Sequence, residues 1–436
     1  MKNVLVFLLA VFFLIFAGCV TDVPVPSQDT VLTNTQTKPP APAVTAAPTP
    51  EPTPIQTTRA EPVEISIMSV GDIMFHGAQI KAAYDESSKT HDFSYSFSFI
   101  NDIIKRADLA IANLECPLAG PDKPYSYPNS KSFSAPDSAA AAIKDAGFDV
   151  LSTINNHSND RGIEGVVRTV DAVRRHDMVA LGTRKDADEP LYYILDINDV
   201  SVGIAAYSYG TRPGKDSVAL NGTKLKGNGK DLINIFTYKT IKDDLIPMGK
   251  LVQEMKNAGA EVVVFVIHAG TEGSRKPNKY QEQLARGLCD AGVDIIFGSH
   301  PHVLQPIEII TSQNGHRTLV AYSLGNFISN QRTKYNKKWT YNEDAMILNV
   351  KIKKYFDGSP IEITAVEYLP TWTMLYTKGS KRYYAVLPLE KALASPDDFD
   401  LNTSYNLRKA KQSFEATNEL MAKAVEKGYL ALMKTD

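Results

Sequence analysis

Acidic, amide and imidazole side chains follow a series of apolar stretches in this sequence. They are Asp72, Glu115, Asn156, His157, His268, His300 and His302. Carboxylate and amide oxygens together with imidazole nitrogens suit divalent cations such as Mn²⁺, Fe²⁺ and Zn²⁺. Two such cations side by side can hold a phosphoryl or acyl group and activate a bridging water. The residues therefore predict a site for one or two divalent metal ions, without specifying which metal.

Each of these residues, taken alone, has a plainer interpretation. Asp72 follows a glycine and could only cap a turn, Glu115 could face solvent, and His268 could be an ordinary loop histidine. The pair His300 and His302, which flanks a proline after an apolar stretch, is more typical of metal ligands. Because the plainer interpretation needs a separate coincidence at each position, we favour the metal site.

Apolar strands alternate with helical stretches from about residue 63 onward. The expected strands are 64–70, 108–112, 148–154, 261–267, 293–297 and 317–323, followed by 346–355 and 360–370. The expected helices are 137–146, 162–176, 240–258, 280–291 and roughly 406–433. Residues 210–232 are rich in Gly, Lys and Asn, which predicts a long loop that can serve as a lid. The alternation predicts an α/β layered sandwich.

The candidate ligands lie where these expected strands end. Residues 146–149 and 291–294 follow one plan, in which a glycine closes a helix and an apolar strand then leads to a histidine. In open α/β sheets, binding sites form in the crevice beyond the carboxyl ends of the strands. We therefore expect the candidate ligands to converge at one edge of the fold.

Composition argues against a nucleic-acid binder and rules out a disulfide-stapled scaffold. The 436 residues carry a formal net charge of −2, whereas nucleic-acid binders need a basic excess or stripe. Three cysteines in this length are too few for a disulfide-stapled scaffold. We expect Cys116 and Cys289 to be small buried side chains, although the sequence leaves a disulfide between them open.

The N-terminus has the features of an export signal and a tether. Residues 4–18 are uncharged, which is short for a spanning helix but typical of a secretory signal. Ala17 and Gly18 before Cys19 resemble a lipoprotein cleavage site, so Cys19 is the expected lipidation site; an uncleaved signal anchor is the alternative. Residues 20–62 are rich in Pro and Thr and predict a disordered stalk. Both interpretations place the folded part outside the cytoplasm as a membrane-tethered protein.

Six motifs resemble those of the bacterial capsule synthesis protein CapA family, which is linked to poly-γ-glutamate and is similar to the calcineurin-like metallophosphatases. They are Gly71-Asp72-Ile73-Met74, Asn113-Leu114-Glu115, Asn155-Asn156-His157-Ser158-Asn159-Asp160-Arg161-Gly162, His268-Ala269-Gly270-Thr271-Glu272, Gly298-Ser299-His300-Pro301-His302 and Ser323-Leu324-Gly325-Asn326-Phe327. The resemblance covers about residues 64–330. It implies an α-β-β-α sandwich of metallophosphatase type over 63–330, with 331–436 as an extension of strands and a helix that packs on it.

The resemblance also implies roles for the site residues. Asp72 and His302 bind the first metal, Glu115 bridges, and the remaining ligands, Asn156, His268 and His300, bind the second. His157 is implied to be the general acid or the group that stabilises the developing charge, and Asp160 orients its ring.

Other positions depart from the phosphatase pattern or add to it. Met74 stands where the phosphatases have a histidine, so His76 is a candidate replacement ligand. We assign Arg161, Glu272 and Asn326 to substrate binding. The further cations Arg275, Lys276 and Arg332 lie beside the motifs and could bind carboxylates.

Three functional hypotheses follow. The first is a metal-dependent hydrolase-like factor that acts on an anionic cell-surface polymer, poly-γ-glutamate. The second is a non-catalytic subunit that binds the polymer and helps a membrane-bound capsule synthase to export or anchor it. The third is a phosphoesterase, against which Met74 weighs.

Overall fold

The computed structural model describes residues 61–126, 132–214, 217–338 and 340–434. The predicted signal sequence, Cys19 and all but the last two residues of the predicted stalk lie outside these ranges. None of the helices in the described part of the chain is both long enough and apolar enough to cross a bilayer.

Strands make up much of the described chain. They are β1 (Val63–Ile73), β2 (Tyr84–Asp85), β3 (Thr90–His91), β4 (Leu109–Leu114), β5 (Val150–Ser152), β6 (Val179–Leu181), β7 (Tyr192–Ile197), β8 (Val200–Tyr209), β9 (Thr211–Gly214), β10 (Ser217–Leu220), β11 (Thr223–Lys224), β12 (Ile235–Phe236), β13 (Val262–His268), β14 (Ile295–Ser299), β15 (Ile307–Thr311), β16 (Arg317–Ala321), β17 (Asp344–Lys354), β18 (Glu362–Lys378), β19 (Lys381–Pro388) and β20 (Ala431–Leu432). The helices are α1 (Gly77–Ala83), α2 (Asn101–Ile104), α3 (Ser138–Asp145), α4 (Gly162–Arg174), α5 (Ile241–Asn257), α6 (Lys279–Ala291), α7 (Leu389–Ala394) and α8 (Ser404–Glu426), with short 3₁₀ turns η1 (Ser94–Phe97), η2 (Gly229–Leu232) and η3 (Pro396–Phe399).

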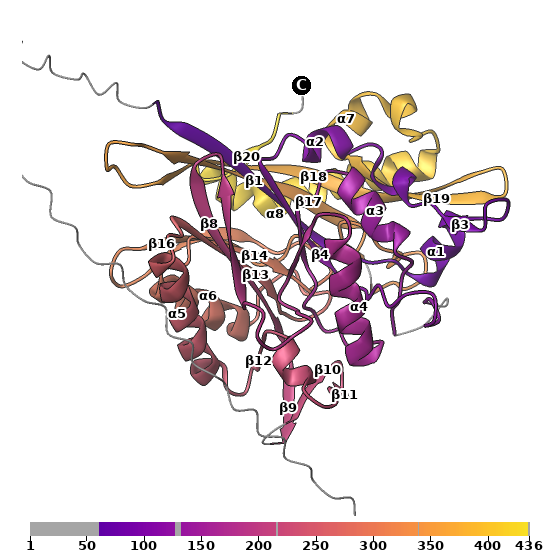
Figure 1. The fold of residues 1–436 in the computed structure, drawn as a ribbon. Coiled ribbons are helices and arrows are strands. Elements are labelled where there is room, and N and C mark those ends of the chain that lie inside the picture. The colour runs from indigo at the N-terminus through magenta and orange to yellow at the C-terminus, as the bar shows by residue number, and fades with distance from the viewer. Residues whose placement is uncertain (1–60, 127–131, 215–216, 339, 435–436) are drawn as a thin grey trace, which may run out of the picture. The chain divides into compact units, whose positions relative to one another are not determined.

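Two large sheets form the centre of the fold (Figure 1). The first runs β19-β18-β17-β1-β4-β5-β6, with β20 beside β18. The second runs β12-β8-β13-β14-β16-β15, with β7 beside β8. Strands β1, β4, β5 and β6 are parallel to one another, as are β8, β13, β14 and β16. Each sheet therefore presents several carboxyl ends along a single edge.

Side chains of the central strands face two apolar layers in alternation. Ile65 and Ile67 of β1 pack between the sheets with residues such as Val264 of β13. Met68 and Val70 point the opposite way, into the core beneath the helices. Successive side chains of a strand face opposite sides, so one strand serves both layers.

Helices cover the outer faces of both sheets. The first sheet packs against α1, α3 and α4, and the second against α5 and α6 (Figure 1). Helices α7 and α8 pack on β18 and β19. The predicted layering of helix, sheet, sheet and helix is confirmed.

The predicted strands and helices are all present, with ends shifted by a few residues. The main extension is β18, which continues to Lys378 rather than ending at residue 370. The predicted end of the last helix lies too far along the chain, since α8 ends at Glu426 and β20 follows it. Gly428 has a positive φ of 74°, a conformation that ends helices.

The prediction of a long loop over 210–232 was wrong. This segment holds β9, β10, β11 and η2, and the three strands form a small sheet of their own. Asn221 and Gly222, both with positive φ, form the tight turn between β10 and β11. Asn198 and Asp199 form a similar turn between β7 and β8, a hairpin that the sequence analysis did not identify.

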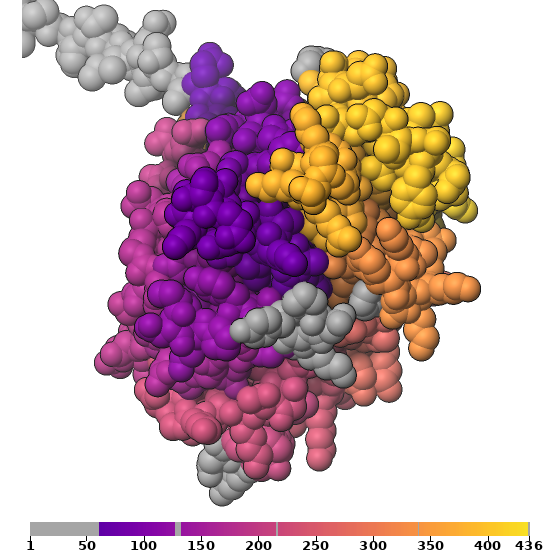
Figure 2. All heavy atoms as spheres, turned by 90° about the vertical axis from the view of Figure 1, so that its right-hand side faces the viewer, coloured from indigo at the N-terminus to yellow at the C-terminus, as the bar shows by residue number. Residues whose placement is uncertain are grey.

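The C-terminal strands continue the first sheet directly. Strand β17 pairs antiparallel with β1, from Val63 opposite Lys354 to Ser69 opposite Leu348. Helix α1 and η1 contact β19, and the Tyr95 hydroxyl donates to Asp400 at 2.9 Å. On the face drawn in Figure 2, yellow C-terminal residues accordingly lie beside indigo N-terminal ones.

Asp344, at the start of β17, makes the stability of the fold sensitive to pH. Burial, followed by the neighbouring Glu343, raises the pKa of this carboxyl to about 7. The native chain therefore keeps a proton on Asp344 that the unfolded chain releases near its ordinary pKa of 3.8. Stability contributed by this group is present at low pH and is lost as the pH rises from about 4 to about 7.

Replacing Asp344 with Asn should raise the free energy of unfolding at pH 8, by about 1–4 kcal/mol, and change it little at pH 4. Urea unfolding of both proteins at the two pH values measures this. Asp290→Asn, an exposed position on α6, is the matched control. A difference between Asp344→Asn and wild type that does not depend on pH would contradict the explanation.

Candidate metal centre

The predicted ligands gather at the carboxyl ends of the parallel strands of both sheets. Asp72 lies near the end of β1, and Glu115 directly follows β4. His268 is the last residue of β13, and His300 directly follows β14. Residues more than two hundred positions apart thus meet where the two sheets present their strand ends.

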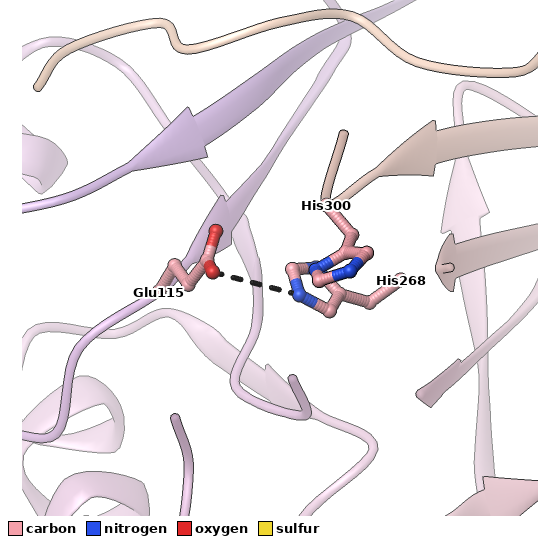
Figure 3. Close-up of side chains that lie close together, drawn as sticks. All are labelled: Glu115, His268 and His300. Carbon is pink, nitrogen blue, oxygen red and sulfur yellow. Dashed lines mark ion pairs between the residues drawn. The ribbon is translucent and has the colours of Figure 1, made fainter. Parts of the chain in front are cut away.

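Glu115 is the centre of this cluster. Its side chain is fully buried, and neither carboxylate oxygen has a hydrogen-bond partner among the described residues. Its Oε1 lies 3.6 Å from Nε2 of His268 and 3.8 Å from Nε2 of His302. Figure 3 shows Glu115 and His268 facing each other, with His300 beside them. Burial, followed by the nearby Asp72, raises the pKa of Glu115 well above its usual value.

Asp72 fixes the orientation of His302. Asp72 Oδ2 and Asn326 Oδ1 lie 3.2 and 3.0 Å from His302 Nδ1. Since both oxygens accept, Nδ1 holds the proton and Nε2 keeps its lone pair. Burial favours the neutral forms of both residues, but their contact reverses this, raising the pKa of His302 and lowering that of Asp72.

Asn326 is itself held in place. Its Nδ2 donates to the carbonyl of Asn342 at 3.0 Å and to Oε1 of Gln331 at 3.2 Å. Its Oδ1 is therefore the atom that faces His302. In this structure Asn326 orients a histidine; its predicted contact with substrate stays a prediction.

Asn156 and His268 are hydrogen-bonded to each other through the atoms that could bind a metal. Asn156 Oδ1 lies 2.9 Å from His268 Nε2, while His268 Nδ1 lies 2.8 Å from the Ser299 hydroxyl. Burial lowers the pKa of His268 to about 3, although Asp72 opposes the shift. His268 is therefore a neutral imidazole at physiological pH, the form that binds metals.

The two histidines of the 300–302 segment have unusual backbone conformations. His300 has φ of 96° and His302 has φ of 60°, both in the left-handed region that non-glycine residues rarely adopt. Such conformations persist where the surroundings impose them, and they gather at functional sites. Burial, followed by the charges of His268 and His302, lowers the pKa of His300 well below normal, and its Nδ1 has no partner among the described residues.

A close backbone crossing beside Asp72 explains one motif glycine. A Cβ atom on Gly71 would lie 1.9 Å from the carbonyl oxygen of Gly325. That same carbonyl accepts from the backbone N–H of Asp72 at 2.9 Å. Only glycine lets the segment after β16 approach β1 this closely, so it links Asp72 to the strand-end loop that carries Asn326.

The donor set fits divalent metal ions. Three groups offer ligand atoms that all lie within 4.8 Å of one another: Glu115 with His268 and His300; Asp72 with Glu115 and His302; and Glu272 with His300 and His302. Glu115 belongs to the first two groups, the position of a bridging ligand. An ionised, fully buried carboxylate without hydrogen bonds is costly unless a cation lies beside it. The orphaned oxygens of Glu115 and the nitrogen of His300 are therefore the best evidence of fit.

His157 and Asp160 form a coupled pair beside these ligands. His157 Nδ1 lies 2.8 Å from Asp160 Oδ2, which also accepts from the backbone N–H of Phe133 at 2.6 Å. The Phe133 ring packs edge-on against His157 at 4.5 Å between centroids. The proton therefore resides on Nδ1, leaving Nε2 free to take part in proton transfer.

Glu272 and His76 differ in their relation to the cluster. Glu272 is exposed and lies within reach of His300 and His302, so its position suits a ligand as well as the predicted substrate contact. His76 Nδ1 lies 3.2 Å from Gln79 Oε1 and accepts from the backbone N–H of Asn330 at 3.3 Å. The candidate ligand groups found in the described chain do not include His76.

Two of the arginines that were predicted to bind anions, Arg161 and Arg332, make hydrogen bonds and ion pairs with other groups of the protein. Arg161 donates to the carbonyl of Pro124 at 3.0 Å and to its own neighbour's carbonyl at 3.1 Å. Arg332 is buried and ion-paired with Glu343, and it donates to the carbonyl of Thr373 at 3.0 Å. Arg332 thus braces the segment after Asn326; substrate binding by Arg161 stays a prediction.

Sequence reasoning missed Tyr209 and the role of Asn113. The Tyr209 ring lies 4.7 Å from His300 and packs parallel to His268 at 6.5 Å between centroids. Asn113 Nδ2 donates to Asp72 Oδ1 at 2.7 Å. Tyr209 is the last residue of β8, so identifying that strand from the sequence would have placed it at the site edge.

The two described cysteines are free and buried. Cys116 packs in the core of the first sheet and Cys289 in the core beneath α5 and α6. Their separate cores exclude a disulfide between them in this fold.

The chain shows a distant likeness to two solved structures. One is a novel phosphatase from Mycoplasma pneumoniae, with 14% identity, TM-score 0.38, and coverage of 71% of this chain and 93% of that chain. The other is a calcineurin-like phosphoesterase, YfkN, from Bacillus subtilis, with 14% identity, TM-score 0.37, and coverage of 71% and 91%. Values of this size say nothing about activity.

Sequence relatives are considerably more similar. The capsule biosynthesis protein CapA of Bacillus anthracis is 29% identical over 316 residues, covering 70% of this chain and 71% of the relative. The PGA biosynthesis protein CapA of Bacillus subtilis (strain 168) is 30% identical over 307 residues, covering 69% and 72%. A family model described as bacterial capsule synthesis protein PGA_cap matches residues 66–331, which contain all the candidate ligands. The chain belongs to this family of bacterial capsule synthesis proteins.

Proposed function

We propose that this protein is a metal-dependent, hydrolase-like factor that acts on poly-γ-glutamate during capsule synthesis. The observation that carries the proposal is the buried Glu115 carboxylate, which has no hydrogen-bond partner among the residues that the structure describes and lies beside the neutral imidazoles of His268 and His300. A centre of this kind is suited to hydrolysis of an acyl or phosphoryl bond. The family membership supports the polymer as substrate, as does the name of the Bacillus subtilis relative, a PGA biosynthesis protein.

We further propose that the protein works outside the cytoplasm, tethered by lipid on Cys19 beside a membrane-bound synthase. Support comes from the sequence alone, namely the uncharged residues 4–18, the small residues before Cys19 and the Pro-rich segment that follows. Such a segment, where extended at roughly 3 Å per residue, reaches on the order of 100 Å from a membrane surface.

The residues divide the chemical work between them. A bound divalent cation would polarise the scissile carbonyl and lower the pKa of a water molecule. Glu115, His268, His300, Asp72 and His302 would hold it, and Asn326 keeps the His302 ring in its metal-binding orientation. Hydrolysis of an amide adds water across the C–N bond, and the leaving nitrogen must receive a proton. With its Nδ1–H held by Asp160, His157 would take the proton released by the attacking water on Nε2 and pass it to the leaving nitrogen.

Glu115→Gln and His300→Ala should each weaken metal binding by at least about tenfold, because each removes a ligand from the cluster. Elemental analysis of the purified proteins, followed by metal titration of the chelated forms, measures this. His176→Ala, on the segment after α4, is the matched control for histidine removal and should bind metal as wild type does. Unchanged metal content in both ligand variants would refute the proposal.

His157→Gln should lower the turnover of poly-γ-glutamate by about 10²–10⁴-fold while leaving metal content unchanged. The expected reason is loss of the proton donor without loss of a ligand. Asp160→Asn should give a smaller loss, since it disturbs only the orientation of the ring. Size-exclusion analysis of polymer incubated with each metal-loaded protein gives the rate.

Two results would favour the other hypotheses. Polymer binding that survives chelation, without turnover by the metal-loaded wild type, would indicate a non-catalytic export or anchoring subunit. Rapid turnover of chromogenic phosphate esters, without cleavage of the polymer, would indicate a phosphoesterase.

A further inference from the structure

A basic groove lies outside the metal centre, between α8 and the segment that follows Arg332. Its volume is about 670 Å³. Lys334 and Lys337 line one wall, and Arg408 and Lys409 of α8 line the other. In Figure 2 the orange segment of the first wall lies next to the yellow C-terminal region.

The charge of this groove is unbalanced. Its lining includes four cations and no carboxylate. Among the described residues, none of the four cations has an ion-pair partner, whereas other surface cations such as Lys123 and Lys354 pair with glutamates. Clustered like charges repel one another, so a groove of this kind is stabilised by an anion that enters it.

The remaining lining suits an extended organic chain. Tyr405 is 44% exposed, and the Arg408 guanidinium lies over its ring at 5.6 Å. Gln412 continues the same face of α8 with an amide. Ring, amide and cations together can contact a chain that carries carboxylates on an aliphatic and amide backbone.

Hydrogen bonds link both walls of the groove to protein segments that carry residues of the metal centre. From Glu272 at the cluster, the chain leads to Arg275, which donates to the carbonyl of Ala416 in α8 at 2.8 Å. On the other side, Asn326 beside His302 bonds Gln331, which directly precedes the groove segment. The two walls are therefore held by the same segments that carry Glu272 and Asn326 at the metal centre.

We propose that this groove binds a polycarboxylate chain and guides it to the metal centre. The identity of the polymer, poly-γ-glutamate, rests on the proposed function. Binding of the polymer in the groove needs no metal. A single exposed Lys–carboxylate contact is weak, and several contacts along one chain add up. Binding should accordingly weaken as salt concentration rises.

The test compares polymer binding by full-length variants. Lys337→Glu with Arg408→Glu places a negative charge on each wall, and Lys242→Glu with Lys250→Glu on exposed positions of α5 makes the same change of charge elsewhere. The probe is purified poly-γ-glutamate of defined length, measured by calorimetry at low salt, with and without chelator. The groove variant should bind about tenfold more weakly or worse, and the α5 variant should bind as wild type does. Metal content should be unchanged in both.

Four other outcomes would overturn the groove proposal or its choice of ligand. Wild-type affinity in the groove variant would overturn the groove proposal and leave the metal-centre proposal standing. Equal losses in the groove and α5 variants would indicate a response to net charge alone and would also overturn it. Tighter binding of polyphosphate or single-stranded DNA than of the polymer would overturn the choice of a polycarboxylate. Binding that disappears with chelator or in Glu115→Gln would place the polymer at the metal and not in the groove.

Discussion

The feature on which the rest of the structure depends is a buried carboxylate at the centre of the ligand cluster, which has no hydrogen-bond partner in the described part of the chain. Glu115 is fully buried, and Asp72 lies near enough to oppose its ionisation. Protein interiors rarely tolerate such a group, because its desolvation is repaid only by a counter-charge or by hydrogen bonds. Three histidines lie around it, and Nδ1 of one of them, His300, also lacks a hydrogen-bond partner among the described residues. A bound divalent cation would satisfy the carboxylate and the imidazole nitrogens together.

The two-sheet architecture is what makes this arrangement possible. Parallel strands bring Asp72 and Glu115 from the first sheet to the same edge as His268 and His300 from the second. The apolar layer between the sheets holds the strands rigid, while the ligands themselves lie on the turns just beyond it. The positive φ values of His300 and His302 and the close approach at Gly71 show that these turns are constrained. Metal sites require this precision, since ligand atoms must meet within a few ångströms.

Much of the fold and most of the cluster could be predicted from the sequence. Continuous apolar runs identify buried parallel strands, and polar residues directly after them, such as His268 and His300, identify the site edge. The strands of the β7–β8 hairpin were harder to predict. No helical stretch in the sequence separates these two strands and marks where each one ends. The Asn221-Gly222 turn was present in the sequence, yet the polar composition around it obscured two short strands.

Contacts made by side chains could not be predicted in this way. Arg332 lies beside a motif and looks like an anion-binding residue in the sequence, but folding buries it against Glu343. Asn326 looks like a substrate contact, but its amide is held by Asn342 so that it faces His302. Tyr209 carries no motif at all and reaches the site only because β8 pairs with β13. Such roles depend on which segments meet across the fold, and sequence order does not record this.

Anomalous X-ray scattering from crystals of the purified protein, at the absorption edges of Mn, Fe and Zn, tests the central claim most directly. We predict an anomalous peak within bonding distance of Glu115 and of at least one nitrogen of His268, His300 or His302. A peak-free cluster in crystals grown with these metals, with Glu115 instead hydrogen-bonded to water or to Asp72, would contradict it.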